Sequence, residues 1–345
     1  MKKSKEYIGL FYNLLTIGEN NLSTDIEKFI PCINSEFAGS ILNEYLRNNV
    51  FHTALISVKQ PVYVVGDLHG DLFDLLRILN RNGLPLQTNY LFLGDYIDRG
   101  QYPVQTLLLL IALHNVYPTN ISLLRGNHEI PSVCEQYGFK EKVLELLGDE
   151  NLMEAFYTVF SYLPLAGIVD NRYFCVHGGI SKNLTSLSNL LRLEMPILEI
   201  TPLVEDLLWS DPANSEEMYL SSARNKGHQF GAAATERFLN STKLSYIIRA
   251  HSYISNGATI FHSAKVISIF SSSHYVEGGN VATIIYLDGV HVFEKLYPAN
   301  YLKVADSSLV PINFEKKLAA TTILKPIIRP KPRHMTPKYR ATLHI

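Results

Sequence analysis

Between Pro61 and Leu124 the chain alternates three short runs rich in β-branched and aromatic residues with two runs of helical periodicity. The β-rich runs are Val62–Val65, Tyr90–Leu93 and Ile121–Leu124, and the helical runs lie near Leu72–Leu79 and Val104–His114. Strands that alternate with helices form βαβ units, in which the strands of one sheet run parallel. The alternation therefore predicts an α/β domain with a substantially parallel sheet in this part of the chain.

After about residue 160 the β-rich runs follow one another more directly. They are Leu163–Val169, Tyr173–Val176, Tyr246–Ile248, Ala258–Phe261, Val266–Phe270, Ala282–Leu287 and His291–Leu296. Asp288-Gly289, between the last two runs, predicts a hairpin with a type I′ turn. Residues 1–60 are expected to be helical, with a buried face at Ile41–Leu46. We expect one domain with two sheets and helices outside them.

The composition is that of an ordinary globular chain, with 345 residues of which 47% are hydrophobic and 18% charged. The 31 basic and 32 acidic residues nearly cancel, so the charge does not indicate binding to nucleic acid or to a membrane surface. The longest apolar run, Leu107–Leu113, is far too short to cross a bilayer, and we expect no membrane insertion.

The two ends of the chain differ in character. The N-terminal apolar stretch Tyr7–Ile17 is preceded by the charged Glu6 and contains the polar Asn13, which favours an amphipathic helix over a signal peptide. The side chains expected to face inward are Leu10, Phe11, Leu14 and Leu15. Residues 316–345 contain eight basic residues, four prolines and no acidic residue, so their net charge is +8. Because the whole chain has a net charge of −1, residues 1–315 have a net charge of −9. We expect a flexible basic extension at residues 316–345.

The cysteines indicate where the protein works. Cys32, Cys134 and Cys175 are scattered, odd in number and without a CxxC pair. Such thiols are typical of a reducing compartment, so we expect a cytoplasmic or nuclear protein.

Polar residues gather where five of the predicted strands end. They are Asp67 and His69 after the first strand of the alternating region, Asp95 after the second, Asn127 after the third, and His177 and His251 after two later strands. The carboxyl ends of neighbouring strands converge, and open α/β sheets place their ligands there. One such cluster alone is weak evidence, and a lone histidine in an apolar strand is more often a core residue. Five clusters in one chain predict a shared site.

The chemistry of this set points to metal. It offers carboxylate and amide oxygens and imidazoles but no thiolate, which suits Mn²⁺, Fe or Zn²⁺ in a reactive site better than a structural zinc. Six such ligands can hold two divalent metal ions with one carboxylate shared. Two ions about 3.5–4 Å apart can activate a water near neutral pH and clamp a phosphoryl group for in-line attack.

The motifs in order resemble one family. They are GDLHG at 66–70, GDYIDRG at 94–100, RGNHE at 125–129, HGG at 177–179, LLWSDP at 207–212 and RAH at 249–251. The chain resembles, from about residue 50 to 298, the phosphoprotein phosphatase family of metal-dependent serine/threonine phosphatases, with the subtype unassigned. The first three motifs mark the wider calcineurin-like metallophosphoesterase superfamily, whereas LLWSDP with RAH narrows the resemblance to protein phosphatases.

The resemblance implies a fold and a domain plan. The fold is α/β, a four-layer α-β-β-α sandwich of two mixed sheets with flanking helices. Residues 1–50 would be an N-terminal helical segment, 51–298 the catalytic domain and 299–345 a C-terminal extension.

The resemblance also implies roles for the motif residues. Asp67 and His69 would hold the first metal; Asn127, His177 and His251 would hold the second, and Asp95 would bridge the two. His128, oriented by Asp98, would protonate the departing alkoxide. Arg99 and Arg224 would grip the phosphate, and Tyr275 would reach the site from the loop after Phe270.

Two segments depart from the family pattern. Arg224 is followed by Asn225 where the family usually has glycine, and Ser271-Ser272-Ser273-His274-Tyr275 stands where the family has Ser-Ala-Pro-Asn-Tyr. These departures concern loop shape and leave the predicted metal site intact.

Two other functions stay open at this point. One is hydrolysis of dinucleoside polyphosphates or other small phosphoesters on the same core. The other is an inactive phosphatase-like module that only binds proteins. The resemblance favours phosphoprotein substrates and regulatory or targeting protein subunits. The tail carries Thr336-Pro337, a candidate phosphorylation site.

Overall fold

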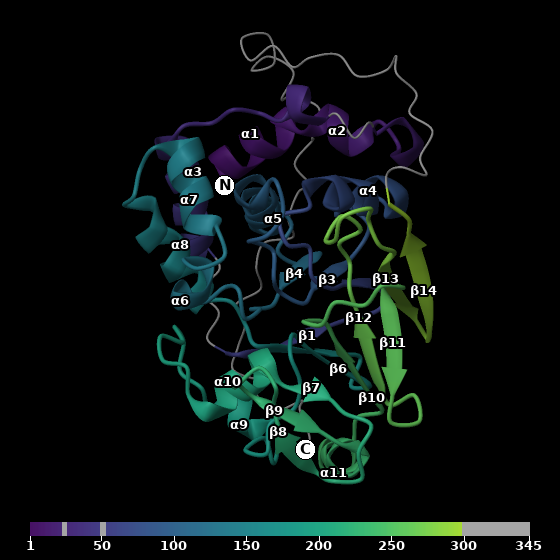
Figure 1. Ribbon diagram of the computed structural model, residues 1–345. Helices are drawn as coiled ribbons and strands as arrows, with labels where there is room; N and C mark the ends of the chain where they lie inside the picture. The colour runs from purple at the N-terminus through teal and green to yellow at the C-terminus, as the bar shows by residue number, and fades with distance from the viewer. Residues whose placement is uncertain (23–25, 49–52, 299–345) are drawn as a thin grey trace, which may run out of the picture.

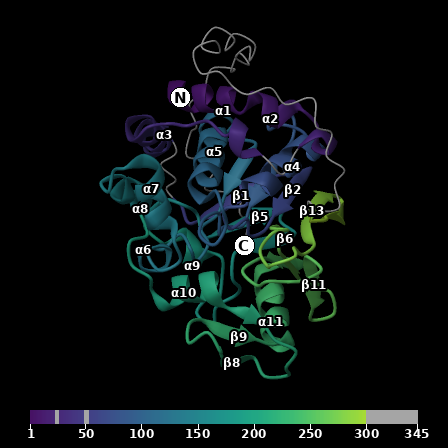
Figure 2. The same ribbon diagram turned by 45° about the horizontal axis from the view of Figure 1, so that its top comes forward.

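Two β-sheets face each other at the centre of the molecule, and helices cover both outer sides. The computed structural model describes residues 1–22, 26–48 and 53–298, and the predicted tail element Thr336-Pro337 lies outside them. Figure 1 shows helices α1 to α5 on one side of the strands and α9 to α11 on the other, and the rotated view of Figure 2 keeps them apart. The four-layer α/β sandwich implied by the resemblance is confirmed.

The first sheet contains the βαβ units. Its order is β14-β13-β2-β3-β4, with bounds Val290–Leu296, Ala282–Asp288, Val62–Val65, Tyr90–Phe92 and Ile121–Leu123. β2, β3 and β4 run parallel, as predicted, because helices α4 (Leu72–Asn82) and α5 (Pro103–Val116) carry the chain back between them. β13 is antiparallel to both of its neighbours, so the sheet is mixed.

The second sheet is also mixed. Its order is β1-β5-β6-β10-β12-β11, with bounds Leu55–Val58, Ala166–Val169, Tyr173–Val176, Tyr246–Arg249, Val266–Ile269 and Ala258–Phe261. β6, β10 and β12 run parallel, whereas β5 and β11 are antiparallel to β6 and β12. The prediction that residues 1–60 are helical is wrong at β1, which pairs in parallel with β5.

A third, small sheet was not predicted. It consists of β7 (Asp211–Pro212), β9 (His228–Phe230) and β8 (Tyr219–Ser221). Their sequences, Asp-Pro, His-Gln-Phe and Tyr-Leu-Ser, lack the runs of β-branched residues that located most of the other strands. The predicted hairpin joins β13 and β14, but of its two turn residues only Gly289 has a positive φ, at 72°. A type I′ turn needs two such residues, so that turn type was wrong.

Three apolar clusters form the core and match the layers. One lies between the two sheets and includes Val64 and Leu91 facing Cys175 and Ile267. The second packs the first sheet against its helices, which are α1 (Lys2–Leu10), α2 (Tyr12–Thr16), α3 (Ser35–Asn48), α4, α5, α7 (Phe139–Leu147) and α8 (Leu152–Ser161). The third packs the other sheet against α9 (Ser188–Leu191), α10 (Pro202–Trp209) and α11 (Ala232–Thr242).

The N-terminal segment follows the amphipathic prediction. Leu10, Phe11, Leu14 and Leu15 are all buried against the other helices of the first sheet. The predicted face at Ile41–Leu46 also points inward through Ile41, Leu42 and Tyr45. Within the described residues, no helix combines the length and the apolar character needed to span a membrane.

Candidate metal centre

The predicted site residues lie on loops at the carboxyl ends of five parallel strands, where the two sheets meet. β2, β3 and β4 lead into the loops of Asp67, Asp95 and Asn127, and β6 and β10 lead into those of His177 and His251. Parallel strands end at the same edge of a sheet, so all these side chains reach one place.

Tight turns bring the loops close together. Asp95 and His251 have left-handed backbone, with φ of 53° and 68°, and so does His69 at 44°. Gly94 has a φ of 108°, and a Cβ there would collide with the backbone of Gly126. Glycine is therefore required at this crossing of two site loops.

Asp95 stands at the centre of the cluster. Its Oδ2 lies 3.6 Å from His69 Nε2, and its Oδ1 lies 3.3 Å from His177 Nε2. It belongs to two groups of possible metal ligands, one with His69 and His128 and the other with His177 and His251. Both groups share the Asp95 carboxylate, but the first contains His128 and not Asp67, which the prediction assigned to the first metal.

The other predicted ligands converge on the same space. Asp67 is fully buried, and its Oδ2 has no hydrogen-bond partner among the residues that the structure describes, although His69 Nε2 is only 3.9 Å away. Asn127 Oδ1 lies 2.9 Å from His177 Nε2 and 2.7 Å from His251 Nδ1. All six predicted ligands are thus brought together.

The ring orientations show that a cation fits here. His177 Nδ1 donates to the Leu93 carbonyl, so Nε2 of the neutral ring presents a lone pair to Asn127 Oδ1. Two facing acceptors need a proton or a metal ion between them. His69 is similar, because its Nδ1 donates to the Ile97 carbonyl and its Nε2 faces Asp95. Fixing one ring nitrogen by a carbonyl is how metal-binding histidines are usually held.

Burial and mutual charge set the pKa values of the cluster. Burial and the charge of Asp95 raise the pKa of Asp67 to about 6. Burial and the neighbouring His128 lower the pKa of His69 to about 3, so this imidazole is neutral and available as a ligand. The carboxylates around His177 outweigh its burial and raise its pKa, as expected where a proton occupies a cation's place.

His128 and Asp98 form a pair beside the cluster. His128 Nδ1 donates to Asp98 Oδ2 at 2.6 Å, and the Phe139 amide donates to the other oxygen of this carboxylate. His128 Nε2 lies 3.9 Å from Asp95 Oδ2, so this edge of the ring faces the centre. Burial alone would lower the pKa of His128, but Asp95 and Asp98 raise it above its ordinary value. The imidazolium form is therefore favoured.

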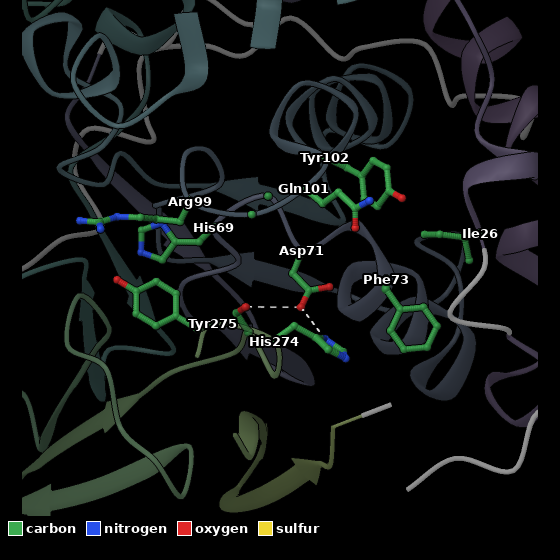
Figure 3. Close-up of a pocket in the computed structure, with 12 residues that line it drawn as sticks. Ile26, His69, Asp71, Phe73, Arg99, Gln101, Tyr102, His274 and Tyr275 are labelled. Atoms are coloured by element: carbon green, nitrogen blue, oxygen red, sulfur yellow. Dashed lines mark hydrogen bonds and ion pairs between the residues drawn. The ribbon is translucent and has the colours of Figure 1, made fainter. Parts of the chain in front are cut away.

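The predicted phosphate-binding residues lie on the open side. Arg99 is exposed, and its guanidinium lies 4.2 Å from the centre of the Tyr137 ring. Arg224 lies in the turn between β8 and β9, where its Nε donates to Asp211 Oδ2 at 2.7 Å. The Tyr275 ring is 5.1 Å from that of His69, and Figure 3 shows Arg99, His69 and Tyr275 grouped at one end of a cavity of about 340 Å³.

Three residues that support the site were not predicted. The Glu129 carboxylate accepts hydrogen bonds from the amides of Asp95, Tyr96 and Gly126, which locks the second loop to the third. Asp211 binds the buried Arg249 as well as Arg224, and Tyr137 packs on both Arg99 and His128. Glu129 lies in the motif RGNHE and Asp211 in the motif LLWSDP, and membership of these motifs is the sequence signal that could have indicated them.

Comparison with known proteins agrees with this site. A model of the calcineurin-like phosphoesterase family matches residues 60–255. A protein serine/threonine phosphatase from Saccharomyces cerevisiae, with similarity to human phosphatase PP5, is 26% identical. The match has a TM-score of 0.72 and covers 77% of this chain and 90% of that one.

A cold-active protein-tyrosine phosphatase from a psychrophilic Shewanella species shares the fold. It is 16% identical with a TM-score of 0.50, and the match covers 70% of this chain and 82% of that one. The family and the grouped histidines and aspartates together support the binding of divalent metal. The family model matches more than half of the 345 residues of the chain, and the chain therefore belongs to the calcineurin-like phosphoesterase family.

Proposed function

We propose that the protein is a serine/threonine protein phosphatase with a binuclear metal centre. The observation that carries the proposal is the sharing of Asp95 between two buried groups of possible ligands, one of which contains the His128 that Asp98 holds. The match to the yeast serine/threonine phosphatase supports a phosphoprotein as the substrate.

The residues divide between two ions around Asp95. Asp67 and His69 would hold one ion with Asp95, and Asn127, His177 and His251 would hold the other. Mn²⁺ is expected to serve in assays, and Fe and Zn²⁺ suit the same ligands in the cell. When bound, such ions activate water near neutral pH and polarise phosphoryl oxygens.

His128 is the proposed general acid. Its Nδ1 is held by Asp98, so the proton on Nε2 points to the centre, where the serine or threonine oxygen of the substrate would leave. Asp95 and Asp98 raise the pKa of His128, which favours the protonated ring. A positioned acid of this kind contributes about 10²–10⁴-fold to the rate.

Arg99 and Arg224 orient the phosphate from the open side. Their guanidinium groups are planar forks that match phosphate oxygens. The Arg224 Nε donates to Asp211, and one terminal nitrogen of the same guanidinium lies 3.4 Å from Ser252 Oγ. Tyr275 would close the site over His69.

A side-by-side assay of Mn²⁺-loaded full-length protein tests the proposal. The substrates are a phosphoserine peptide, the same peptide with phosphothreonine, the same peptide with phosphotyrosine, and a dinucleoside polyphosphate. We expect kcat/KM to be highest for the first two. Preference for the dinucleotide would indicate a small-molecule phosphoesterase, and no turnover of any substrate would indicate a binding module.

Cellular context extends the proposal. The scattered thiols favour a cytoplasmic or nuclear location. We expect regulatory or targeting subunits to select substrates, and residues 51–298 to act as the catalytic domain between an N-terminal helical segment and a C-terminal extension. Fractionation of cells and affinity purification of the full chain would test these expectations.

A further inference from the structure

The loop between β12 and β13 is tied to the start of α4 by hydrogen bonds to two buried aspartates. His274 Nδ1 donates to Asp71 Oδ2 at 2.9 Å, and Ser272 Oγ donates to the same oxygen at 3.4 Å. The Ser273 amide donates to Asp74. Asp71 and Asp74 are 8% and 0% exposed, whereas the His274 side chain is 36% exposed, so these bonds are buried at their aspartate end.

The two aspartates are fixed independently of the loop. Asp71 is the N-cap of α4, because its Oδ1 accepts from the Asp74 amide at 2.9 Å. Asp74 pairs with the buried Arg77 at 2.7 Å. Asp71, Asp74 and His274 lie close enough to hold a metal ion, but Arg77 already neutralises Asp74. The aspartates instead provide a rigid edge against which the loop is fastened.

The neighbouring residue in the loop is Tyr275. Figure 3 shows the His274 side chain directed toward Asp71 and Phe73, while Tyr275 lies on the other side near His69 and Arg99. The Tyr275 ring is 5.0 Å from Phe270 and stacks at 5.6 Å on Tyr253, in addition to its contact with His69. The two adjacent side chains thus point away from each other, and an anchor on His274 restrains the backbone that carries Tyr275.

The geometry points to a positioning role. Asp71 follows His69 by two residues, so one short segment carries both a predicted metal ligand and the anchor of the loop. We propose that the Asp71–His274 hydrogen bond is a positioning device that holds Tyr275 over His69 at the mouth of the metal centre. This inference rests on the proposed phosphatase function. His274 acts through Tyr275 and does not itself touch the reacting atoms.

A double-mutant cycle on the Mn²⁺-loaded full chain tests this. His274→Ala and Tyr275→Ala should each lower kcat/KM for a phosphoserine peptide by about tenfold, and the double variant should lose about tenfold, because both remove the same interaction. His274→Asn, with an amide nitrogen near the place of Nδ1, should recover most of the loss. Losses that multiply to about a hundredfold, or no loss in Tyr275→Ala, would overturn the proposal.

A matched control is His262→Ala. His262 is hydrogen-bonded through both ring nitrogens, to Thr235 and to the Ala213 carbonyl, and it lies between β11 and β12. Its loss should leave kcat/KM unchanged. An equal loss in His262→Ala would assign the effect of His274 to general stability and would contradict a positioning role.

Hydrogen–deuterium exchange gives a second measurement that does not need turnover. Within the loop, the Asn280 amide donates to the Ser273 carbonyl at 2.8 Å and the Tyr275 amide donates to Asn280 Oδ1 at 3.2 Å. His274→Ala should speed exchange in residues 271–281, and His274→Asn should restore it. If the wild type hydrolyses no phosphoester, the proposed function fails, and unchanged exchange in His274→Ala then separately overturns the positioning role.

Discussion

The two walls of the site are held in different ways. On the metal side, Asp67, Asp95 and His177 are almost completely buried and are fixed by backbone amides and carbonyls of neighbouring loops. On the phosphate side, Arg99 and Arg224 are exposed and each depends on few side-chain partners. Changes on the buried wall should therefore abolish the chemistry, whereas changes on the exposed wall should tune substrate binding.

The largest effect is expected at Asp95, which serves both ligand groups. Asp95→Asn removes the shared charge and should lower turnover by about 10⁴-fold, with loss of bound metal. Metal analysis and steady-state kinetics measure both. Chelation should abolish the activity of the wild type, and Mn²⁺ should restore part of it. Asp170→Asn is a control, because Asp170 has similar left-handed backbone, with φ of 45°, on the surface. Full turnover at zero metal content would contradict the mechanism.

The next effect separates acid catalysis from metal binding. His128→Asn should lower kcat for phosphoserine peptides by about 10²–10⁴-fold, since the alkoxide then leaves without a proton. Aryl phosphates have better leaving groups and should lose much less. Kinetics on both substrate types, with metal content measured in parallel, check this. Equal losses on both would give His128 another role, such as that of a metal ligand.

A smaller effect is expected on the exposed wall. Arg224→Ala should raise KM for phosphopeptides by about 10- to 100-fold, because one charged donor to the phosphate is lost. Metal content should stay unchanged. Arg172→Ala is the control, since Arg172 lies over the ring of Tyr173 away from the site. Loss of metal from Arg224→Ala would show that the two walls are not independent.

The pH dependence of metal binding should test directly whether Asp67, on the buried side of the site, is a metal ligand. Asp67 has a pKa of about 6 in the metal-free protein, and a carboxylate must be ionised to bind metal. Mn²⁺ affinity should therefore rise with pH up to about 6 and fall about tenfold for each pH unit below it. Calorimetry in buffers of different ionisation enthalpy measures the released protons. Affinity independent of pH between 5 and 7 would exclude Asp67 as a ligand.

The smallest effect concerns the basic extension, for which the sequence gives only charge. Deletion of residues 317–345 should leave folding unchanged and lower KM for basic phosphopeptides by about two- to fivefold at low salt. The reason is that the basic extension competes with these peptides for the acidic surface of residues 1–315. The difference should disappear near 1 M salt, where the Debye length is about 3 Å. Identical kinetics of both proteins at low salt would show that the extension does not approach the site.

Sequence patterns predicted the buried wall better than the exposed one. Asp67, Asp95 and Asn127 each follow a β-rich run directly, so local periodicity located them. The Asp211 carboxylate accepts hydrogen bonds from Arg249, which is 38 residues away in the sequence, and from Arg224 in a turn of the small sheet. β7 consists of Asp211 and Pro212 alone and contains no strand-forming run. Contacts of this kind depend on tertiary structure and leave no local pattern.

The left-handed backbone at His69, Asp95, Asp98, Arg99 and His251 has a consequence for protein engineering. Each such residue costs on the order of 1–2 kcal/mol relative to glycine or a relaxed turn. A selection for heat resistance alone would favour glycine at these positions and would erase the site before it altered the core. Libraries that aim to stabilise this protein should therefore hold these five positions constant, or screen for activity in every round.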